Sequence, residues 1–187
     1  HPWEPFAPSG ARVLFLGSFP PPRKRWTMEF YYPNRQNDFW KIMGEIFFGD
    51  AAYFILKEEK AFNLPLIVET MSKKGIALYD TGLEVKRLKG NASDNFLQIV
   101  TPTDIAGLMK KMPHCCTIAV TGEKAAATLL TPYGETPPAI GQKRDIEIAS
   151  RKVEVWRMPS TSRAYPLPLA EKAAYYRRIL ETAKVIF

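Results

Sequence analysis

The sequence predicts an α/β protein, a three-layer α/β/α sandwich around a central, mostly parallel four-stranded sheet. Four short apolar segments have the composition of strands that are buried on both faces. Helical repeats of apolar residues lie between them, and strands that alternate with helices pair in parallel through right-handed crossovers. With 187 residues, of which 46% are hydrophobic, we expect one domain that covers residues 1–187.

Each predicted strand ends at a polar or turn-forming segment. In the first strand, the apolar run Val13–Leu16 stops at Gly17. The last strand can belong to a hairpin over residues 145–156, since the Pro/Gly-rich segment 131–139 precedes it. The four predicted strands are Arg12–Ser18, Gly75–Asp80, Cys116–Thr121 and Lys152–Met158.

Between and after the strands, apolar residues recur at helical spacing in four segments. The segment Gly82–Phe96 is instead polar and basic and contains Gly90 and Asn91. We therefore expect a long loop there, and loops of this length are often functional. The predicted helices are Asn37–Phe48, Asp104–Met112, Glu123–Leu130 and Leu169–Val185.

Residues 13–40 carry most of the candidate chemistry. Pro20, Pro21 and Pro22 follow the first strand, and each fixes φ near ~−65° and removes a backbone donor. The result is a rigid loop beyond the carboxyl end of the strand, where open α/β sheets bind ligands. Five aromatic residues and three uncharged amides follow between Phe30 and Trp40. Flat rings and amide edges suit a nucleobase.

Composition narrows the class of partner. The formal net charge of +7 favours a polyanion, although such a charge also occurs in proteins that bind no nucleic acid. No apolar run approaches the ~20 residues of a membrane span, and no basic-then-apolar signal segment opens the chain. We expect a soluble, intracellular monomer. Because the sequence starts at His1 rather than Met, we also expect that a residue was processed or omitted before it.

The cysteines and histidines predict no metal site. Cys115 and Cys116 are adjacent within an apolar run, which suits neither a disulfide framework nor tetrahedral metal coordination, so we expect both in the core. His114 is one of only two histidines, and two cysteines cannot hold a four-cysteine iron–sulfur cluster. We expect neither a metal nor a cofactor.

Polar segments follow the first, second and fourth strands, and the carboxyl ends of parallel strands meet at one edge. These segments are GSFPP (17–21), YDTG (79–82) and MPSTSRAY (158–165). In this order they resemble the loop motifs of the uracil-DNA glycosylase superfamily. Within it the chain is similar to the branch described as hypoxanthine-DNA glycosylases, through GSFP (17–20), Tyr31-Tyr32 and QNDFW (36–40). The likeness extends to residues 75–80 and 121–125 and so runs over nearly the whole chain.

The resemblance implies a DNA glycosylase that hydrolyses the N-glycosidic bond of a deaminated base, uracil or hypoxanthine, in base excision repair. Its partner would be DNA that contains the damaged base. No lysine is placed as a Schiff-base nucleophile, so we expect no lyase step. Phe19 and Met158 replace residues that often carry catalysis in this superfamily, which leaves a catalytically idle DNA- or nucleobase-binding protein as the alternative. A flavodoxin-like or nucleotide-binding protein is disfavoured, because a GxGxxG fingerprint is absent.

Asn37 is the catalytic candidate that the resemblance implies. Many superfamily members carry Asp or Asn at the position of Phe19 to orient the hydrolytic water, and in the hypoxanthine branch Asn37 takes over near the sugar. An amide oxygen accepts a hydrogen bond but removes no proton, which a dissociative cleavage tolerates. Asn37 can also cap the helix that follows it, and the two roles are compatible.

The remaining candidates surround the proposed base. Each candidate also has an ordinary structural explanation. The aromatic residues can pack in the core, and Asp80 can cap a helix or turn. The hydroxyl residues can form a turn, and the basic residues can lie on a solvated surface. Candidates for base binding are Phe19, Phe30, Tyr32 and Asp80, with Gly17, Ser18 and Pro20 as the pocket loop. Candidates for DNA binding are Arg23, Lys24, Arg25, Ser160, Thr161, Ser162 and Arg163.

Overall fold

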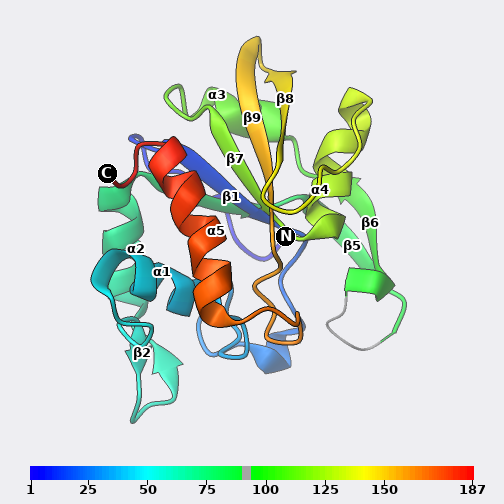
Figure 1. The fold of residues 1–187 in the computed structure, drawn as a ribbon. Helices are drawn as coiled ribbons and strands as arrows, with labels where there is room; N and C mark the ends of the chain where they lie inside the picture. The colour runs from blue at the N-terminus through cyan, green and yellow to red at the C-terminus, as the bar shows by residue number, and fades with distance from the viewer. Residues whose placement is uncertain (90–93) are drawn as a thin grey trace.

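A five-stranded sheet forms the centre of the molecule in the computed structural model, which describes residues 1–89 and 94–187 (Figure 1). The strand order is β4-β1-β7-β9-β8. Four strands are parallel, and β8 runs antiparallel to β9 at one edge. The bounds are Val13–Gly17 for β1, Ile76–Asp80 for β4, Thr117–Thr121 for β7, Lys143–Ile148 for β8 and Arg151–Met158 for β9.

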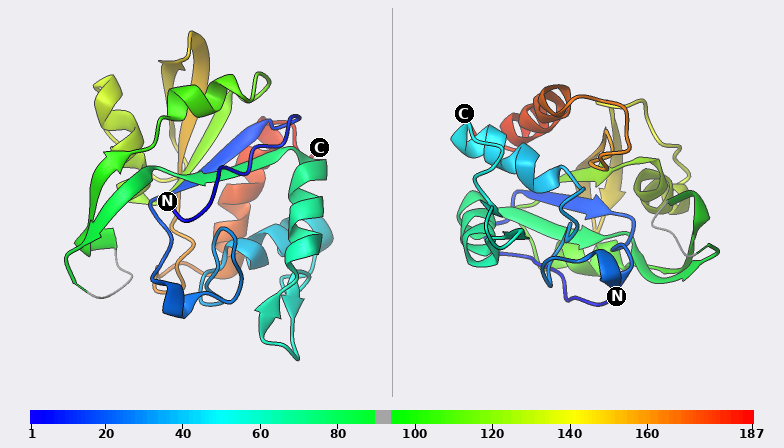
Figure 2. Two further views of the ribbon diagram at one scale, coloured as in Figure 1. Left: turned by 180° about the vertical axis from the view of Figure 1, so that it is seen from behind. Right: turned by 90° about the horizontal axis from the view of Figure 1, so that it is seen from below.

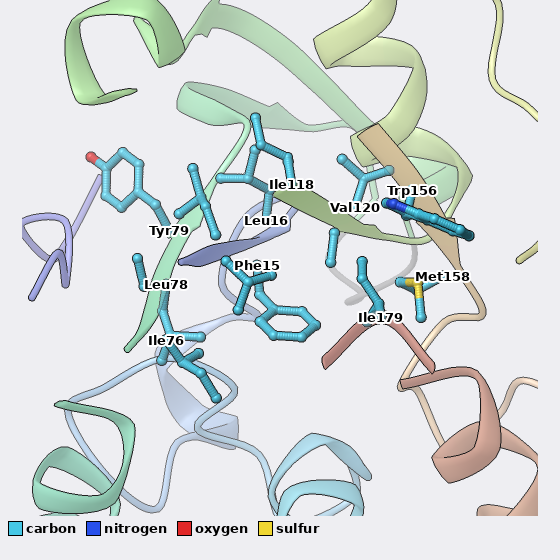
Figure 3. Close-up of a cluster of buried hydrophobic side chains, with 14 of the residues drawn as sticks. Phe15, Leu16, Ile76, Leu78, Tyr79, Ile118, Val120, Trp156, Met158 and Ile179 are labelled. Atoms are coloured by element: carbon cyan, nitrogen blue, oxygen red, sulfur yellow. The ribbon is translucent and has the colours of Figure 1, made fainter. Parts of the chain in front are cut away.

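The α/β/α architecture and the mostly parallel sheet are confirmed, with one correction to the number of strands. The four predicted strands are the parallel ones, and β8 adds a fifth that pairs with β9 as a hairpin. Every residue of β1, β4 and β7 is buried, because helices cover both faces of the sheet. Figure 3 shows the resulting core, in which Phe15 lies on the same side of β1 as Ile179 from the C-terminal helix, while Leu16 and Ile118 lie on the opposite side.

Helices cover the sheet on both faces. Figure 2 shows α1 and α5 on one face and α3 and α4 on the other, while α2 packs beside β4. The helices are α1 (Phe39–Phe48), α2 (Leu64–Lys74), α3 (Ile105–Lys110), α4 (Glu123–Leu130) and α5 (Leu169–Thr182), with short 3-10 turns η1 (Arg23–Arg25), η2 (Asp94–Phe96) and η3 (Thr131–Tyr133).

The sequence prediction did not include α2, although its start signal is present. Asn63 caps the helix by accepting a hydrogen bond from the Leu66 backbone N–H at 3.3 Å, and Pro65 occupies its first turn. Gly75 ends it in the left-handed conformation with φ of 67°. The apolar stripe of α2 is short, because only Ile67, Thr70 and Met71 are buried, so its periodicity was weak.

Two small hairpins project from the sandwich, β2 (Ile55–Leu56) with β3 (Ala61–Phe62) and β5 (Gly82–Arg87) with β6 (Leu97–Pro102). The prediction of a long loop over Gly82–Phe96 is therefore wrong for its first part, which is strand β5, and its end, which is η2. A two-stranded ribbon that is mostly exposed needs no apolar alternation, so the polar composition of this segment did not indicate a strand. Gly90 and Asn91 lie outside the described residues.

The cysteines are divided between core and surface. Cys115 is buried, whereas Cys116 is exposed, so the prediction of two core cysteines is wrong for Cys116. The chain enters β7 from a surface turn after α3, and only the first thiol faces inward. Within residues 1–89 and 94–187, no cluster of three or more His, Cys, Asp or Glu side chains is arranged to bind a metal. No helix in this part of the chain has the length and apolar character to cross a bilayer.

Candidate functional site

A cleft of about 1140 Å³ lies at the carboxyl ends of the parallel strands. The loop after β1, the segment before α1 and the loop after β9 all contribute to its walls. The structure therefore brings together most of the candidates from sequence. Those that line the cleft are Gly17, Ser18, Phe19, Pro20, Arg25, Tyr32, Asn37, Asp80, Ser160, Thr161, Ser162 and Arg163.

Gly17 and Asp80 meet where β1 and β4 end side by side. A Cβ on Gly17 would lie 2.4 Å from Asp80 Oδ1, so a side chain at position 17 would displace the carboxyl group. The other oxygen, Oδ2, lies 2.8 Å from Nε2 of the buried His1. Burial raises the pKa of Asp80 to about 7, against a weaker opposing effect from the Gly17 backbone hydrogen bond. Asp80 is therefore a cleft carboxyl that changes protonation near neutral pH.

A second carboxyl group, Asp94, reaches the cleft from the β5–β6 hairpin. Ser18 Oγ donates a hydrogen bond to Asp94 Oδ1 at 2.8 Å. Burial raises the pKa of Asp94, although the hydrogen bond from Ser18 opposes this. The sequence prediction missed this residue, and the only available signal was its position in a polar segment expected to be functional.

Three aromatic candidates occupy different places. Tyr32 stacks on Phe39 with ring centroids 3.9 Å apart, and its hydroxyl lies 3.2 Å from Thr121 Oγ1, which also lines the cleft. Phe19 lies on the cleft wall. Phe30 is not a lining residue, since its ring packs against Phe6, Tyr31 and Trp40. Phe30 is partly buried and packs against the core, so the structure does not bring it together with the other base-binding candidates.

Asn37 lies at a junction between two loops. Its Oδ1 accepts a hydrogen bond from the Phe39 backbone N–H at 2.9 Å, so it does cap the start of α1 while its side chain lines the cleft. Its backbone forms an antiparallel bridge with Ser162. On either side of this bridge, the Asp38 N–H donates to the Thr161 carbonyl at 2.7 Å, and the Arg163 N–H donates to the Gln36 carbonyl at 3.2 Å. The candidate amide and the hydroxyl loop are thus fixed to each other.

A buried ion pair stabilises this junction between Asn37 and the loop after β9. Lys172 in α5 is 1% exposed, and its Nζ lies 2.9 Å from Asp38 Oδ2 and donates to the Ser162 carbonyl at 2.9 Å. The pair ties α5 to the start of α1 and to the loop after β9. A lysine within the apolar stripe that includes Ala173 and Tyr176 was the available sequence signal.

Basic side chains gather at the rim of the cleft. Arg25 and Arg163 line both the cleft and an adjoining polar depression, to which Arg35 also contributes. Lys24 is exposed and Arg23 pairs with Glu29 at 2.7 Å, and neither lines these cavities. Arg25 is therefore the one residue of the cluster 23–25 that lines these cavities, together with Arg35 and Arg163, and Lys124 and Arg157 also line the cleft.

Comparisons with known proteins support the fold. No protein-family model matches the chain, and no curated protein matches it. A solution NMR structure of a Methanosarcina acetivorans protein, named as a proposed uracil DNA glycosylase, is similar to it with a TM-score of 0.62 and 24% sequence identity. The similarity covers 96% of each chain, so the α/β/α fold of this chain is shared, over nearly its whole length, with that protein.

Proposed function

We propose that the protein is a monofunctional DNA glycosylase that hydrolyses the N-glycosidic bond of a deaminated base, uracil or hypoxanthine, as in base excision repair. The observation that carries this proposal is the cleft, which combines amide groups, aromatic rings and three carboxyl groups with an arginine rim. The name of the structural neighbour and the resemblance to the hypoxanthine branch support it.

The dimensions of the cleft suit a nucleotide that has left the helix. A glycosylase extrudes its target, because the bond that it cleaves is inaccessible in the base stack. Phe19 and Tyr32 supply aromatic surface, and Ser160 with Ser162 supplies hydroxyl groups for the adjoining phosphates. Arg25 and Arg163 at the rim match the negative charge of the backbone.

Asp80 can pair with the edge of a nucleobase. Uracil and hypoxanthine both present a carbonyl next to an N–H. A neutral carboxyl group donates to a carbonyl and accepts from an N–H. Because burial raises the pKa of Asp80 to about 7, this neutral form is available at physiological pH. The same group can donate to the unprotonated nitrogen and accept from the amino group of cytosine or adenine, so Asp80 alone does not select the deaminated base.

Asn37 acts on the sugar side of the reaction. The hydrogen bond from the Phe39 N–H fixes the orientation of its amide, so the group can hold a water molecule or the sugar in one place. It removes no proton, and in a dissociative cleavage the main requirement is to stabilise the departing base and the oxocarbenium-like sugar.

The proposal is tested with duplexes that contain deoxyuridine or deoxyinosine opposite each normal base. We expect the wild-type protein to form abasic product from at least one lesion. Asn37→Ala should lower the single-turnover rate by about 100-fold, the range for loss of one positioned polar group. Asn63→Ala is the matched control, since Asn63 also caps a helix but does not line the cleft. Absence of abasic product from every duplex would overturn the proposal.

Two apolar residues favour one alternative, a DNA- or nucleobase-binding protein without catalysis. Phe19 and Met158 both line the cleft and supply no polar group there from their side chains. Salt-sensitive DNA binding without base release would support this alternative.

The absence of a lyase step is tested separately. Lys124 lines the cleft, and trapping of a covalent DNA adduct by borohydride would contradict this expectation.

A further inference from the structure

We propose that Asp94 is the general base of this cleft, the carboxylate that takes a proton from the hydrolytic water. The inference rests on the proposed glycosylase function and adds a residue to it. It follows from the carboxyl groups of the cleft, from the contacts that hold Asp94 there and from the charges around it.

Three carboxyl groups of the described residues line the cleft, Asp80, Asp94 and Glu123. Glu123 has a side chain that is 76% exposed and pairs with Arg157 at 3.1 Å, so it remains an ordinary surface anion. Asp80 has its Oδ2 against His1 and its Oδ1 against Gly17, which leaves it little freedom to accept a proton from water. Asp94 is the remaining carboxyl group that is partly withdrawn from solvent and open to the cleft.

The β5–β6 hairpin is attached to the loop after β1 at three points. Ser18 Oγ donates to Asp94 Oδ1 at 2.8 Å, and the Gly82 N–H donates to the Ser18 carbonyl at 3.0 Å. The Arg87 guanidinium donates to the Pro20 carbonyl. These contacts hold Asp94 against the loop that contains Phe19, whose ring supplies no acceptor. Ser18 binds Oδ1, so Oδ2 is the oxygen that we assign to the water.

Burial and the neighbouring charges shift the pKa of Asp94 in opposite directions. Asp80 from β4 and burial raise its pKa, while Lys124 from α4, Arg87 from β5 and the Ser18 hydrogen bond lower it. The net direction is upward. A general base is most effective when its pKa lies near the working pH, so this shift strengthens Asp94 as a proton acceptor.

The reaction balances with water as the only co-reactant. The bond between C1′ and the base nitrogen breaks, and its electron pair leaves with the base. Water then adds to the cationic C1′, the new C1′–O bond forms, and the proton lost from water passes to Asp94. The departing base gains a proton, and Asp94 returns its proton to solvent, which leaves an abasic sugar and the free base.

The test compares wild type with Asp94→Asn in single-turnover assays over a series of pH values. We expect the wild-type rate to rise as Asp94 ionises. Asp94→Asn should lower the plateau by about 100-fold and abolish this rise, with unchanged affinity for lesion-containing DNA. Glu59→Gln, an exposed site on the β2–β3 hairpin, is the control and should behave as wild type.

Ser18→Ala gives an independent readout if the Asp94 variant does not fold. Because the Ser18 hydrogen bond lowers the pKa of Asp94, its removal should move the rise in rate to higher pH. An active wild type with an unchanged pH profile in both variants would overturn the role of Asp94 and leave the proposed function intact. A wild type that releases no base would overturn both.

Discussion

At the residue scale, the site depends on carboxyl groups whose surroundings differ. Asp80 is buried beside His1 and Gly17, whereas Asp94 is held by the Ser18 hydroxyl on a projecting hairpin. The two environments suit different tasks, because a neutral carboxyl group can recognise a base edge and an ionised one can accept a proton. Under the two proposals, Asp80 recognises the base and Asp94 accepts the proton.

The raised pKa of Asp80 predicts a pH dependence of stability. The folded protein keeps its proton up to about pH 7, whereas an unfolded chain releases it near pH ~3.9. The contribution of Asp80 to stability is therefore fully present below about pH 4 and is lost as the pH rises to about 7. Asp80→Asn should remove this loss, which amounts to about 4 kcal/mol at most.

Urea unfolding of both proteins at the two ends of this range measures the effect. Asp145→Asn, on the exposed edge strand β8, is the control and should keep the wild-type pH dependence. An Asp80→Asn variant whose free energy of unfolding varies with pH as in wild type would contradict the assignment.

At the element scale, the position of the candidate amide depends on α5. Lys172 projects from this helix to Asp38 and to the Ser162 carbonyl, and the backbone bridge between Asn37 and Ser162 lies in front of it. Three segments that are distant in the chain are therefore held by one ammonium group. A buried charge of this kind is costly to leave unpaired, so its loss affects both stability and the site.

Lys172→Met should destabilise the protein by about 3 kcal/mol, because buried Asp38 would lose its nearest cation and keep the longer contacts with Lys41 at 3.7 Å and Arg163 at 4.0 Å. The double variant Lys172→Met/Asp38→Asn should recover part of this loss. Lys73→Met is the matched control. Lys73 forms an ion pair with Glu69, but both side chains are exposed, so this substitution should change stability little. Denaturant unfolding measures all three variants. Equal stability of Lys172→Met and wild type would show that the pair is not needed.

At the scale of the whole molecule, the charge is positive and the arginines of the rim are concentrated at the cleft. The net charge of +7 attracts a polyanion, and the depression formed by Arg25, Arg35 and Arg163 lies beside the proposed base site. The carboxyl ends of four parallel strands create this location, since every loop that lines it leaves the sheet at the same edge. Under the proposed function, charge and topology would direct DNA to this face.

DNA binding should weaken as salt increases, with a slope set by the number of phosphates that the protein contacts. Arg163→Gln should reduce that slope by about 1 and weaken binding to all sequences alike. Lys57→Gln, on the exposed β2–β3 hairpin, keeps the same change in net charge and should leave the slope nearly unchanged. Fluorescence anisotropy over a series of KCl concentrations measures both. Equal slopes for the two variants would rule out a phosphate contact by Arg163.

The local sequence determined the layers of this fold and the edge at which the cleft lies. Buried parallel strands are continuous apolar runs, and helices carry a periodic apolar stripe, so β1, β4, β7 and β9 and four of the helices could be predicted. The loops after β1 and β9 followed from the rule that strand ends meet at one edge. The β5–β6 ribbon could not be predicted, because an exposed ribbon shows neither a continuous apolar run nor a periodic apolar stripe.

Only the tertiary structure decided which side chains share the cleft. His1 and Asp80 are 79 residues apart in the chain, and Ser18 and Asp94 are 76 apart, so no local pattern connects them. Aromatic residues fill cores and line pockets equally well, and the fold packed Phe30 against the core but placed Tyr32 at the wall of the cleft. The sequence therefore determined that a site exists at this edge, and long-range packing decided its acids and its walls.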